Sequence, residues 1–426
     1  MKSIVALLLP IVFCVCLEAA GQEPCDEALL AIQNVRVFDG EALIPQATVV
    51  IGCTRILQVV SGEKSMVLRP GSTVLDGRGK TLLPGLIDTH THTWSLPMLE
   101  RPLDFGVTTV MDMGSTNRKF AASMKAEREK WPARDRADLY SAVLWVTAPG
   151  SHGTQWAEVP TLVEPKDAAS FVATRVDEGA DFIKIIYDNF KMFDADIPTL
   201  KKETMEATVD AAHAQGMIAV VHSRDIDAWA DVVTAGVDGI VHLSVDEVPG
   251  TALINQMREQ DVWVGVNLSL NRPLGKSLVE DPVIGPMLTA SEKERLLDFQ
   301  AMHREGGDQV ALDTVKALHA AGITLLPGSD APNGGTITGA TMHRELEALV
   351  NIGFTPGEAL KSATADSAAA FKLFDRGRIA EGLQADLLLV EGAPDQNIKD
   401  TRNIVIVIKA GTVHEGPLSP AASGPG

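Results

Sequence analysis

The sequence predicts an α/β protein in which a (β/α)8 TIM barrel carries a small, discontinuous β-sandwich formed by the N- and C-terminal segments. The 426 residues suffice for one large barrel with a smaller attached domain. Apolar, strand-like runs alternate with helical stretches over residues 81–375. Short β-rich runs separated by turns occupy residues 28–80 and return at residues 376–418.

The first 21 residues have the order of a secretory signal peptide. Met1–Ser3 gives a short basic start, residues 4–17 form an almost unbroken apolar run, and small residues follow at 19–21. The apolar run is too short to serve as a stable membrane anchor. We therefore expect a secreted or periplasmic protein, processed near residue 21.

The cysteines are consistent with such a compartment but leave their pairing open. Cys14 and Cys16 lie within the signal segment, so Cys25 and Cys53 alone remain in the mature chain. In an oxidising compartment these two could form a disulfide, and two unpaired buried thiols are an equal alternative. Two cysteines spaced in this way do not form a thiolate metal site.

The two ends of the chain are expected to form one domain. Strand-like runs occur at residues 31–37, 47–51 and 55–60, and again at residues 385–390 and 404–409. The economical interpretation is a single β-sandwich, assembled from residues 28–80 and 376–418, beside the barrel.

Residues 81–375 contain eight strand candidates with helical stretches between them. Buried parallel strands appear as continuous runs of Val, Ile and Leu, and the crossovers between them need a dozen or more residues. Helices are expected at 202–215, 228–235 and 308–321. The strand candidates are Leu83–Thr91, Thr108–Met113, Tyr140–Val146, Phe182–Tyr187, Ile218–Ser223, Gly239–Ser244, Trp263–Ser269 and Thr324–Asp330.

The charge balance argues against two kinds of partner. With 37 Lys and Arg against 56 Asp and Glu, the formal net charge is −19. An acidic surface repels phosphate backbones and anionic lipid headgroups, so we expect no nucleic-acid binding and no peripheral membrane binding. The sequence leaves open whether the chain forms a homo-oligomer.

Four histidines stand at the carboxyl ends of predicted strands. His90 and His92 are two residues apart on the first strand, so both imidazoles face the same side. His222 and His242 end the fifth and sixth strands. Because barrel enzymes hold their chemistry at this end, four imidazoles there indicate a metal site.

A carboxylate and a lysine extend the candidate site. Asp330 ends the eighth strand, which lies beside the first in a closed barrel, and it is a candidate ligand and proton acceptor as well as a candidate helix cap. Lys184 lies within the apolar fourth strand. A charged lysine is costly to bury, so Lys184 should be modified, paired or functional unless its chain reaches the surface.

This set of residues, in this order on strands one, four, five, six and eight, resembles the amidohydrolase superfamily with a binuclear site. Four sequence segments resemble the same superfamily, at residues 83–88, 106–112, 179–184 and 382–387. They are most similar to the branch of imidazolonepropionase-like proteins and metal-dependent Xaa-Pro or Xaa-Arg/Lys dipeptidases.

The resemblance implies two divalent ions and a modified lysine. His90, His92 and Asp330 would hold one ion, His222 and His242 the other, and a CO2-derived carbamate on Lys184 would bridge them. Nitrogen and oxygen ligands without thiolate favour zinc, with manganese, cobalt or iron as substitutes.

The implied activity is hydrolysis of a C–N bond by a metal-activated hydroxide, in an amide, dipeptide or N-acyl amino acid. Asp330 would then carry a proton to the leaving nitrogen. His152, after the third strand, would contact the substrate carbonyl, and Tyr187 would line the pocket. Arg224 would either bind a substrate carboxylate or pair with Asp225 at the surface.

Three alternatives remain beside this hypothesis. The same chemistry serves a lactonase or phosphotriesterase-like enzyme, and a cyclic-amide hydrolase of the imidazolonepropionase type is related. Such mononuclear relatives commonly lack the strand-four lysine that is present here as Lys184. A degenerate binding scaffold is the alternative that is not an enzyme, although such proteins lose ligands and this chain retains all six.

Overall fold

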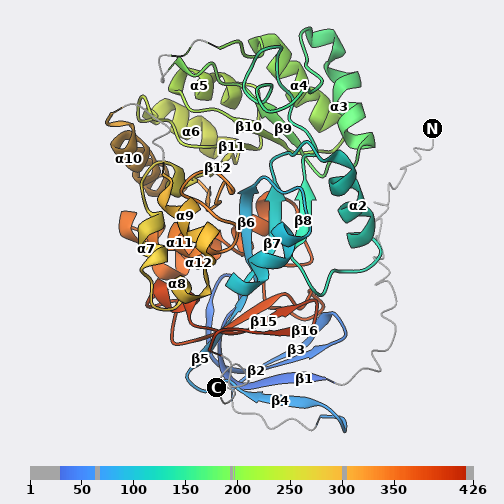
Figure 1. The fold of residues 1–426 in the computed structure, drawn as a ribbon, viewed down its shortest axis with the longest axis vertical. Coiled ribbons are helices and arrows are strands. Elements are labelled where there is room, and N and C mark those ends of the chain that lie inside the picture. Colours follow the sequence, from blue (N-terminus) through green and yellow to red (C-terminus); the bar gives the residue numbers. More distant parts are fainter. Residues whose placement is uncertain (1–28, 63–67, 192–194, 196, 300–304, 419–426) are drawn as a thin grey trace, which may run out of the picture.

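The computed structural model describes residues 29–62, 68–191, 195, 197–299 and 305–418. The predicted signal segment at 1–21 and Cys25, the other cysteine expected in the mature chain, lie outside these ranges. Figure 1 shows a helix-covered barrel above a smaller β-domain in which blue N-terminal and red C-terminal strands lie side by side. Within the described ranges, every helix is too short or too polar to cross a bilayer.

The two ends of the chain build one sheet, as the sequence predicts. Its strand order is β16-β15-β14-β5-β1-β2-β3, with β4 paired to β1. Apolar side chains from both halves of the sheet share one core, so the sheet folds over on itself. Its strands are β1 (Leu30–Phe38), β2 (Leu43–Gly52), β3 (Arg55–Ser61), β4 (Thr73–Asp76), β5 (Lys80–Pro84), β14 (Leu387–Glu391), β15 (Ile404–Lys409) and β16 (Thr412–Glu415).

Eight parallel strands follow in the order of the chain, and each falls within, or overlaps, one predicted segment. They form two ladders, β6-β7-β8 and β9-β10-β11-β12-β13. Parallel bridges between Thr91 and Ala331 and between Val146 and Ile185 join the ladders into a ring. The strands are β6 (Leu86–Thr91), β7 (Val107–Asp112), β8 (Asp138–Ser141), β9 (Ile183–Ile186), β10 (Ala219–His222), β11 (Gly239–Val241), β12 (Trp263–Gly265) and β13 (Leu325–Leu326). The predicted TIM barrel is confirmed.

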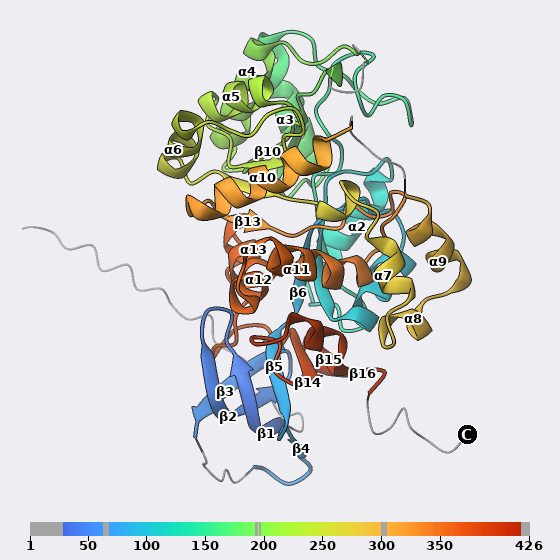
Figure 2. The same cartoon turned by 90° about the vertical axis from the view of Figure 1, so that its left-hand side faces the viewer.

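Helices cover the outside of the barrel (Figure 2). The predicted helices at 202–215, 228–235 and 308–321 correspond to α4, α5 and α10. Asp225 caps α5 by accepting the backbone N–H of Ala228. The helices are α1 (Pro97–Glu100), α2 (Arg118–Arg128), α3 (Ala168–Asp177), α4 (Lys202–Ala214), α5 (Ile226–Thr234), α6 (Thr251–Glu259), α7 (Gly275–Val279), α8 (Ile284–Met287), α9 (Ala290–Leu297), α10 (Gly307–Ala320), α11 (Ala340–Ile352), α12 (Pro356–Ser362) and α13 (Ala365–Ala370).

A buried ionic network joins the barrel to the β-domain. Asp138 begins β8, and its Oδ2 accepts hydrogen bonds from Arg376 at 2.6 Å and from Lys409 of β15 at 2.8 Å. Lys409 also donates to Asp386 at 2.9 Å. All four side chains are buried, so this network fixes the two parts of the molecule at the end of the barrel where the strands begin.

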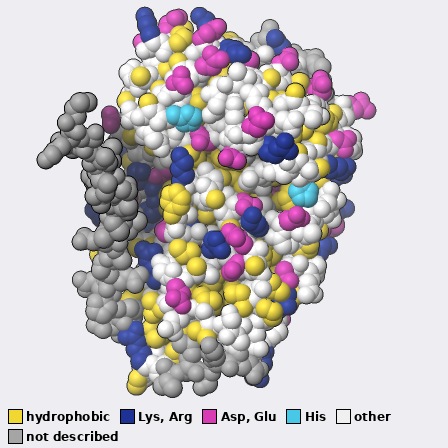
Figure 3. Space-filling model, turned by 180° about the vertical axis from the view of Figure 1, so that it is seen from behind, with side chains coloured by type: hydrophobic (Ala, Val, Ile, Leu, Met, Phe, Trp, Pro, Cys, Tyr) yellow, Lys and Arg dark blue, Asp and Glu magenta, His cyan; other side chains and the backbone are white. Residues whose placement is uncertain are grey.

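The outer surface carries both signs of charge. Figure 3 shows acidic and basic side chains intermingled with apolar ones over the described part of that face.

Candidate metal centre

Asp88 holds the first barrel strand against the end of the eighth. Its Oδ1 accepts the backbone N–H groups of Ser329 at 2.9 Å and His90 at 3.2 Å, and its Oδ2 accepts the Ser329 hydroxyl at 2.6 Å. The Asp330 N–H then donates to the His90 carbonyl at 2.7 Å. These bonds place Asp330 directly beside the histidine pair of β6.

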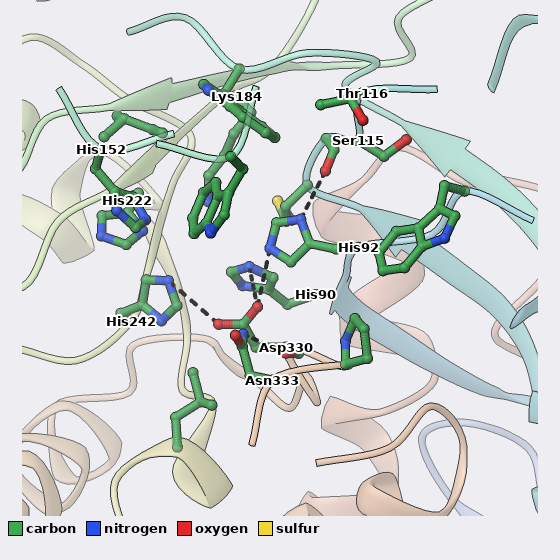
Figure 4. A pocket seen from close by; sticks show the side chains of 18 of the residues that line it. His90, His92, Ser115, Thr116, His152, Lys184, His222, His242, Asp330 and Asn333 are labelled. Carbon is green, nitrogen blue, oxygen red and sulfur yellow. Dashed lines mark hydrogen bonds and ion pairs between the residues drawn. The ribbon is translucent and has the colours of Figure 1, made fainter. Parts of the chain in front are cut away.

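Asp330 lies at the centre of three imidazoles (Figure 4). Its Oδ1 is 3.3 Å from Nε2 of His90 and 3.2 Å from Nε2 of His92, and its Oδ2 is 3.9 Å from Nε2 of His242. Burial opposes ionisation, but His90, His92 and Lys184 together hold the pKa of the Asp330 carboxyl well below its usual range. Asp330 is therefore an ionised carboxylate at neutral pH.

The histidine tautomers suit metal binding. Nδ1 of His92 donates to the Gly114 carbonyl at 2.8 Å, so Nε2, which faces Asp330, is the ring nitrogen available to a metal. Burial lowers the pKa of His92, but the Asp330 carboxylate and the Gly114 carbonyl raise it above the usual value, so a metal at Nε2 would displace a proton. Burial lowers the pKa of His90, His222 and His242 well below the usual value, so these three rings are neutral. Neutral imidazole is the form that binds metals.

His222 and His242 adjoin the first group. Their ring centroids are 4.4 Å apart, and that of His242 lies 4.9 Å from that of His90. His222 ends β10 and His242 follows β11, so adjacent strands bring them together. The four histidines and Asp330 that the sequence singles out thus converge at the carboxyl ends of the barrel strands.

Lys184 points to the same cavity from β9. It is buried and lines the cavity with the histidines and Asp330. Its Nζ has no hydrogen-bond partner among the described residues, and burial lowers its pKa to about 7. Lys184 therefore does not reach the surface, which was the alternative that the sequence left open.

The donor set fits the metal ions that the resemblance implies. His90, His92 and Asp330 offer ligand atoms that all lie within 4.8 Å of one another. Among the described residues, several buried atoms lack a hydrogen-bond partner, including Nδ1 of His90, Nζ of Lys184 and Oδ1 of Asp330. Unsatisfied buried polar atoms are costly, and bound cations would satisfy those with lone pairs.

Asp188 is a site residue that the sequence analysis missed. It follows β9 and is fully buried, and its Oδ2 lies 3.3 Å from Nε2 of His222. Burial raises the pKa of Asp188 to about 6, while the Phe190 N–H, which bonds to Oδ1 at 2.8 Å, opposes that shift. A carboxylate just past the end of a barrel strand could have been noticed by the rule that singled out Asp330.

His152 lies in the cavity, as predicted. Its ring centroid is 5.0 Å from that of His222 and 4.7 Å from that of Phe190. Nδ1 is 3.1 Å from the side-chain nitrogen of Gln155, whose oxygen accepts the Gly153 N–H. The amide therefore donates to Nδ1, which leaves the ring proton on Nε2. Burial lowers the pKa of His152 to about 3.

The predictions for Arg224 and Tyr187 have different outcomes. Arg224 is buried and lines the cavity, and Asp225 caps α5 instead of pairing with it at the surface. Tyr187 does not line this cavity, because its hydroxyl donates to Asp231 of α5 at 2.9 Å. Since side chains alternate along a strand, Lys184 and Ile186 face the cavity and Tyr187 faces the helices.

Comparisons with known proteins agree with this fold. The amidohydrolase family model matches residues 81–414. An uncharacterized protein of Mycobacterium tuberculosis is 26% identical over 361 residues, covering 80% of this chain and 86% of the relative. An imidazolonepropionase of Anaeromyxobacter dehalogenans is 24% identical over 426 residues, covering 88% of this chain and 92% of the relative.

A solved structure has the same fold. The crystal structure of a Xaa-Pro dipeptidase with methionine bound in the active site matches with a TM-score of 0.73 and 22% identity, covering 91% of this chain and 100% of that chain. With the family match over most of the sequence, this chain belongs to the amidohydrolase family. It is a hydrolase that acts on C–N bonds of small molecules.

Proposed function

We propose that the chain is a binuclear, metal-dependent hydrolase that cleaves an amide, dipeptide or N-acyl amino acid bond. The observation that carries the proposal is the convergence of four histidines, Asp330 and Lys184 at one end of one cavity. The likeness to a Xaa-Pro dipeptidase supports it at the level of the fold. His90, His92 and Asp330 would hold one ion, and His222 and His242 the other.

Bound divalent ions would make water more acidic and polarise a carbonyl oxygen, and zinc suits this nitrogen and oxygen donor set. Lys184 is the remaining buried donor, and as a carbamate it would supply carboxylate-like oxygen ligands for the ions. The lowered pKa of Lys184 supports carbamate formation, because the uncharged amine is the form that reacts with CO2.

The chain's own groups supply proton transfer and orientation. Asp330, ionised at neutral pH, would take a proton from the attacking water and return it to the leaving nitrogen. His152 would donate its Nε2 proton to the substrate carbonyl oxygen, since Gln155 occupies Nδ1. The cavity has a volume of about 470 Å³, which suits a dipeptide-sized substrate.

Metal analysis joined to a substrate panel tests the proposal. The purified protein should contain two divalent ions per chain, lose hydrolysis of dipeptides and N-acyl amino acids on chelation, and regain it with zinc. Asp330→Asn should lower kcat by at least about 100-fold. One ion or none, with hydrolysis insensitive to chelator, would contradict the proposal. Lactones and phosphotriesters in the same panel would reveal the alternative chemistries.

We further propose that the protein is secreted or periplasmic. The support is the order of residues 1–21 in the sequence together with Cys53, which is disulfide-bonded in the structure. We propose that its partner is Cys25, the other cysteine expected in the mature chain. Mass spectrometry of the unreduced mature protein should find an N-terminus near residue 22 and a cross-linked peptide containing Cys53. An intact Met1 and a free Cys53 thiol would exclude this localisation.

A further inference from the structure

The cavity that holds the candidate metal centre carries features that metal binding does not explain. Several large apolar side chains line it, and two of them, Trp94 and Trp156, are also exposed to solvent at 44% and 60%. Exposed tryptophans at the edge of a cavity are costly unless they meet an apolar ligand. Of the described residues that line this cavity, Lys184 and Arg224 are the two with long basic side chains.

Four rings form a continuous aromatic wall, which we define as Trp145, Trp156, His152 and Phe190. The centroid of Trp156 lies 5.9 Å from that of Trp145 and 4.8 Å from that of His152, and His152 lies 4.7 Å from Phe190. The wall ends at the metal-centre residue His222, 5.0 Å from His152. It therefore runs from solvent to the residues that would perform the chemistry.

Trp145 is closely packed against two glycines within this wall. A Cβ on Gly114 would lie 2.8 Å from its ring, and a Cβ on Gly153 would lie 2.2 Å from its Nε1. Both glycines have positive φ angles, of 116° and 95°, so both the space and the backbone conformation require glycine. A rigid aromatic surface can bind a flat or bulky apolar group at little cost in side-chain entropy.

Arg224 supplies a buried cation beside the metal centre. It is 2% exposed, and its guanidinium donates to Asn271 at 3.4 Å. An arginine guanidinium carries a positive charge at neutral pH. A guanidinium that borders a largely apolar cavity is suited to bind a carboxylate through paired hydrogen bonds.

We propose that the substrate is an N-acyl amino acid or dipeptide with a free carboxylate that binds Arg224 and an aromatic or bulky apolar side chain that packs on the aromatic wall. The proposal deepens, and rests on, the proposed C–N bond hydrolysis. Water adds its hydroxyl to the acyl carbon as the C–N bond breaks, and the nitrogen takes the remaining proton. The products are a carboxylic acid and an aromatic or apolar amino acid.

Three matched probes test the two halves of this proposal: N-acetyl-L-phenylalanine, its methylamide, which lacks the carboxylate, and N-acetylglycine, which lacks the ring. Acetate release by the metal-loaded wild-type protein should have a kcat/KM at least about tenfold higher for the first probe than for either of the others. Arg224→Met should remove the preference for the acid over the methylamide. Trp156→Ala should reduce the preference for phenylalanine over glycine.

A control variant and a binding measurement separate this proposal from the proposed function. Arg258→Met, at an exposed position on α6 outside the cavity, should keep both preferences. Calorimetry should show L-phenylalanine binding at least about tenfold more tightly to the wild type than to Arg224→Met, whether or not hydrolysis occurs.

Two results would distinguish the proposed substrate class from the proposed C–N bond hydrolysis. Hydrolysis of all three probes at equal rates, unchanged in Arg224→Met, would overturn the substrate class and leave the C–N hydrolase standing. Arg224-dependent binding of phenylalanine without any acetate release would refute the proposed hydrolysis of N-acyl bonds and retain the carboxylate site. Arg224→Met should lose binding while its melting temperature stays that of the wild type, which excludes misfolding as the cause. Arg224→Lys, which keeps the charge, should retain part of the affinity.

Discussion

At the scale of single residues, Asp188 changes the interpretation of the metal centre. Its buried Oδ2 lies 3.3 Å from Nε2 of His222, and a proton shared between these two atoms would leave Nδ1 of that ring for a metal. Carboxylates that hold the far nitrogen of a ligating histidine fix the ring orientation and the tautomer. Asp188 is therefore a positioning residue for His222.

Asp188→Asn should weaken metal binding by about 10- to 100-fold, because the amide removes the charge that stabilises the His222 tautomer. The dissociation constant can be measured by competition with a coloured chelator. The exposed Asp227→Asn on α5 is the matched control and should bind metal as the wild type does. Equal affinities in Asp188→Asn and wild type would show that this carboxylate does not orient the ring.

Sequence position identified most of the candidate site, because the carboxyl ends of parallel strands meet at one rim. That rule placed the four histidines and Asp330, and the cost of burying a charge singled out Lys184. It did not reveal that Asp188 turns back toward β10, since the direction of a residue beyond a strand depends on the turn that follows. The sequence analysis left open whether Tyr187 lines the pocket or packs elsewhere, although strand alternation from Lys184 already pointed it outward.

At the scale of elements, Glu345 of α11 supports the loop that follows β12. Its oxygens accept the N–H groups of Leu268 at 2.8 Å and Ser269 at 2.6 Å, at the start of the 3-10 turn η4 (Leu268–Leu270). Leu270 lines the cavity, and Asn271 bonds to Arg224. The carboxylate thus connects a barrel helix to the wall of the candidate site.

Glu345→Ala should lower the free energy of unfolding by about 2–3 kcal/mol, because two buried N–H groups lose their acceptor. Urea unfolding measures the change. Glu345→Gln, which keeps a carbonyl acceptor, should lose less. An Ala variant as stable as the wild type would mean that η4 holds its shape without this helix.

The strands were more predictable than the loops. Each of the eight parallel strands lies within, or overlaps, a predicted apolar run, because burial on both faces leaves a continuous Val, Ile and Leu pattern. Their ends were not predictable in the same way. The expected strand 263–269 stops at Gly265 because Asn267 adopts a left-handed φ of 42° and η4 begins.

At the scale of the whole molecule, the buried network around Asp138 holds the barrel on the β-domain. Burial would raise the pKa of the Asp138 carboxyl, but Lys409 and Arg376 lower this pKa below the usual range. The unfolded chain therefore binds a proton more readily than the folded one. This contribution to stability is complete above the unfolded pKa of about 4 and declines as the pH falls toward the folded value.

Asp138→Asn should lower the free energy of unfolding by about 3–5 kcal/mol at neutral pH, since Arg376 and Lys409 lose a buried counter-charge. The difference from the wild type should shrink in acid below about pH 4. Guanidinium unfolding at several pH values measures both effects. Glu280→Gln, in an exposed pair with Lys276, should change stability by less than about 1 kcal/mol. A constant difference across the pH range would argue against the ionic origin.

The shared sheet of the two chain ends has a consequence for the order of synthesis. β5 pairs with β14, and Leu83 lies opposite Leu388. β5 is synthesised early and β14 late, so β5 has no pairing partner on this side until almost the whole chain has been made. The whole barrel leaves the ribosome, and for an exported chain crosses the membrane, before that neighbour arrives. A chain truncated before residue 387 would thus expose the β5 edge, with apolar Leu82 and Leu83, to other molecules.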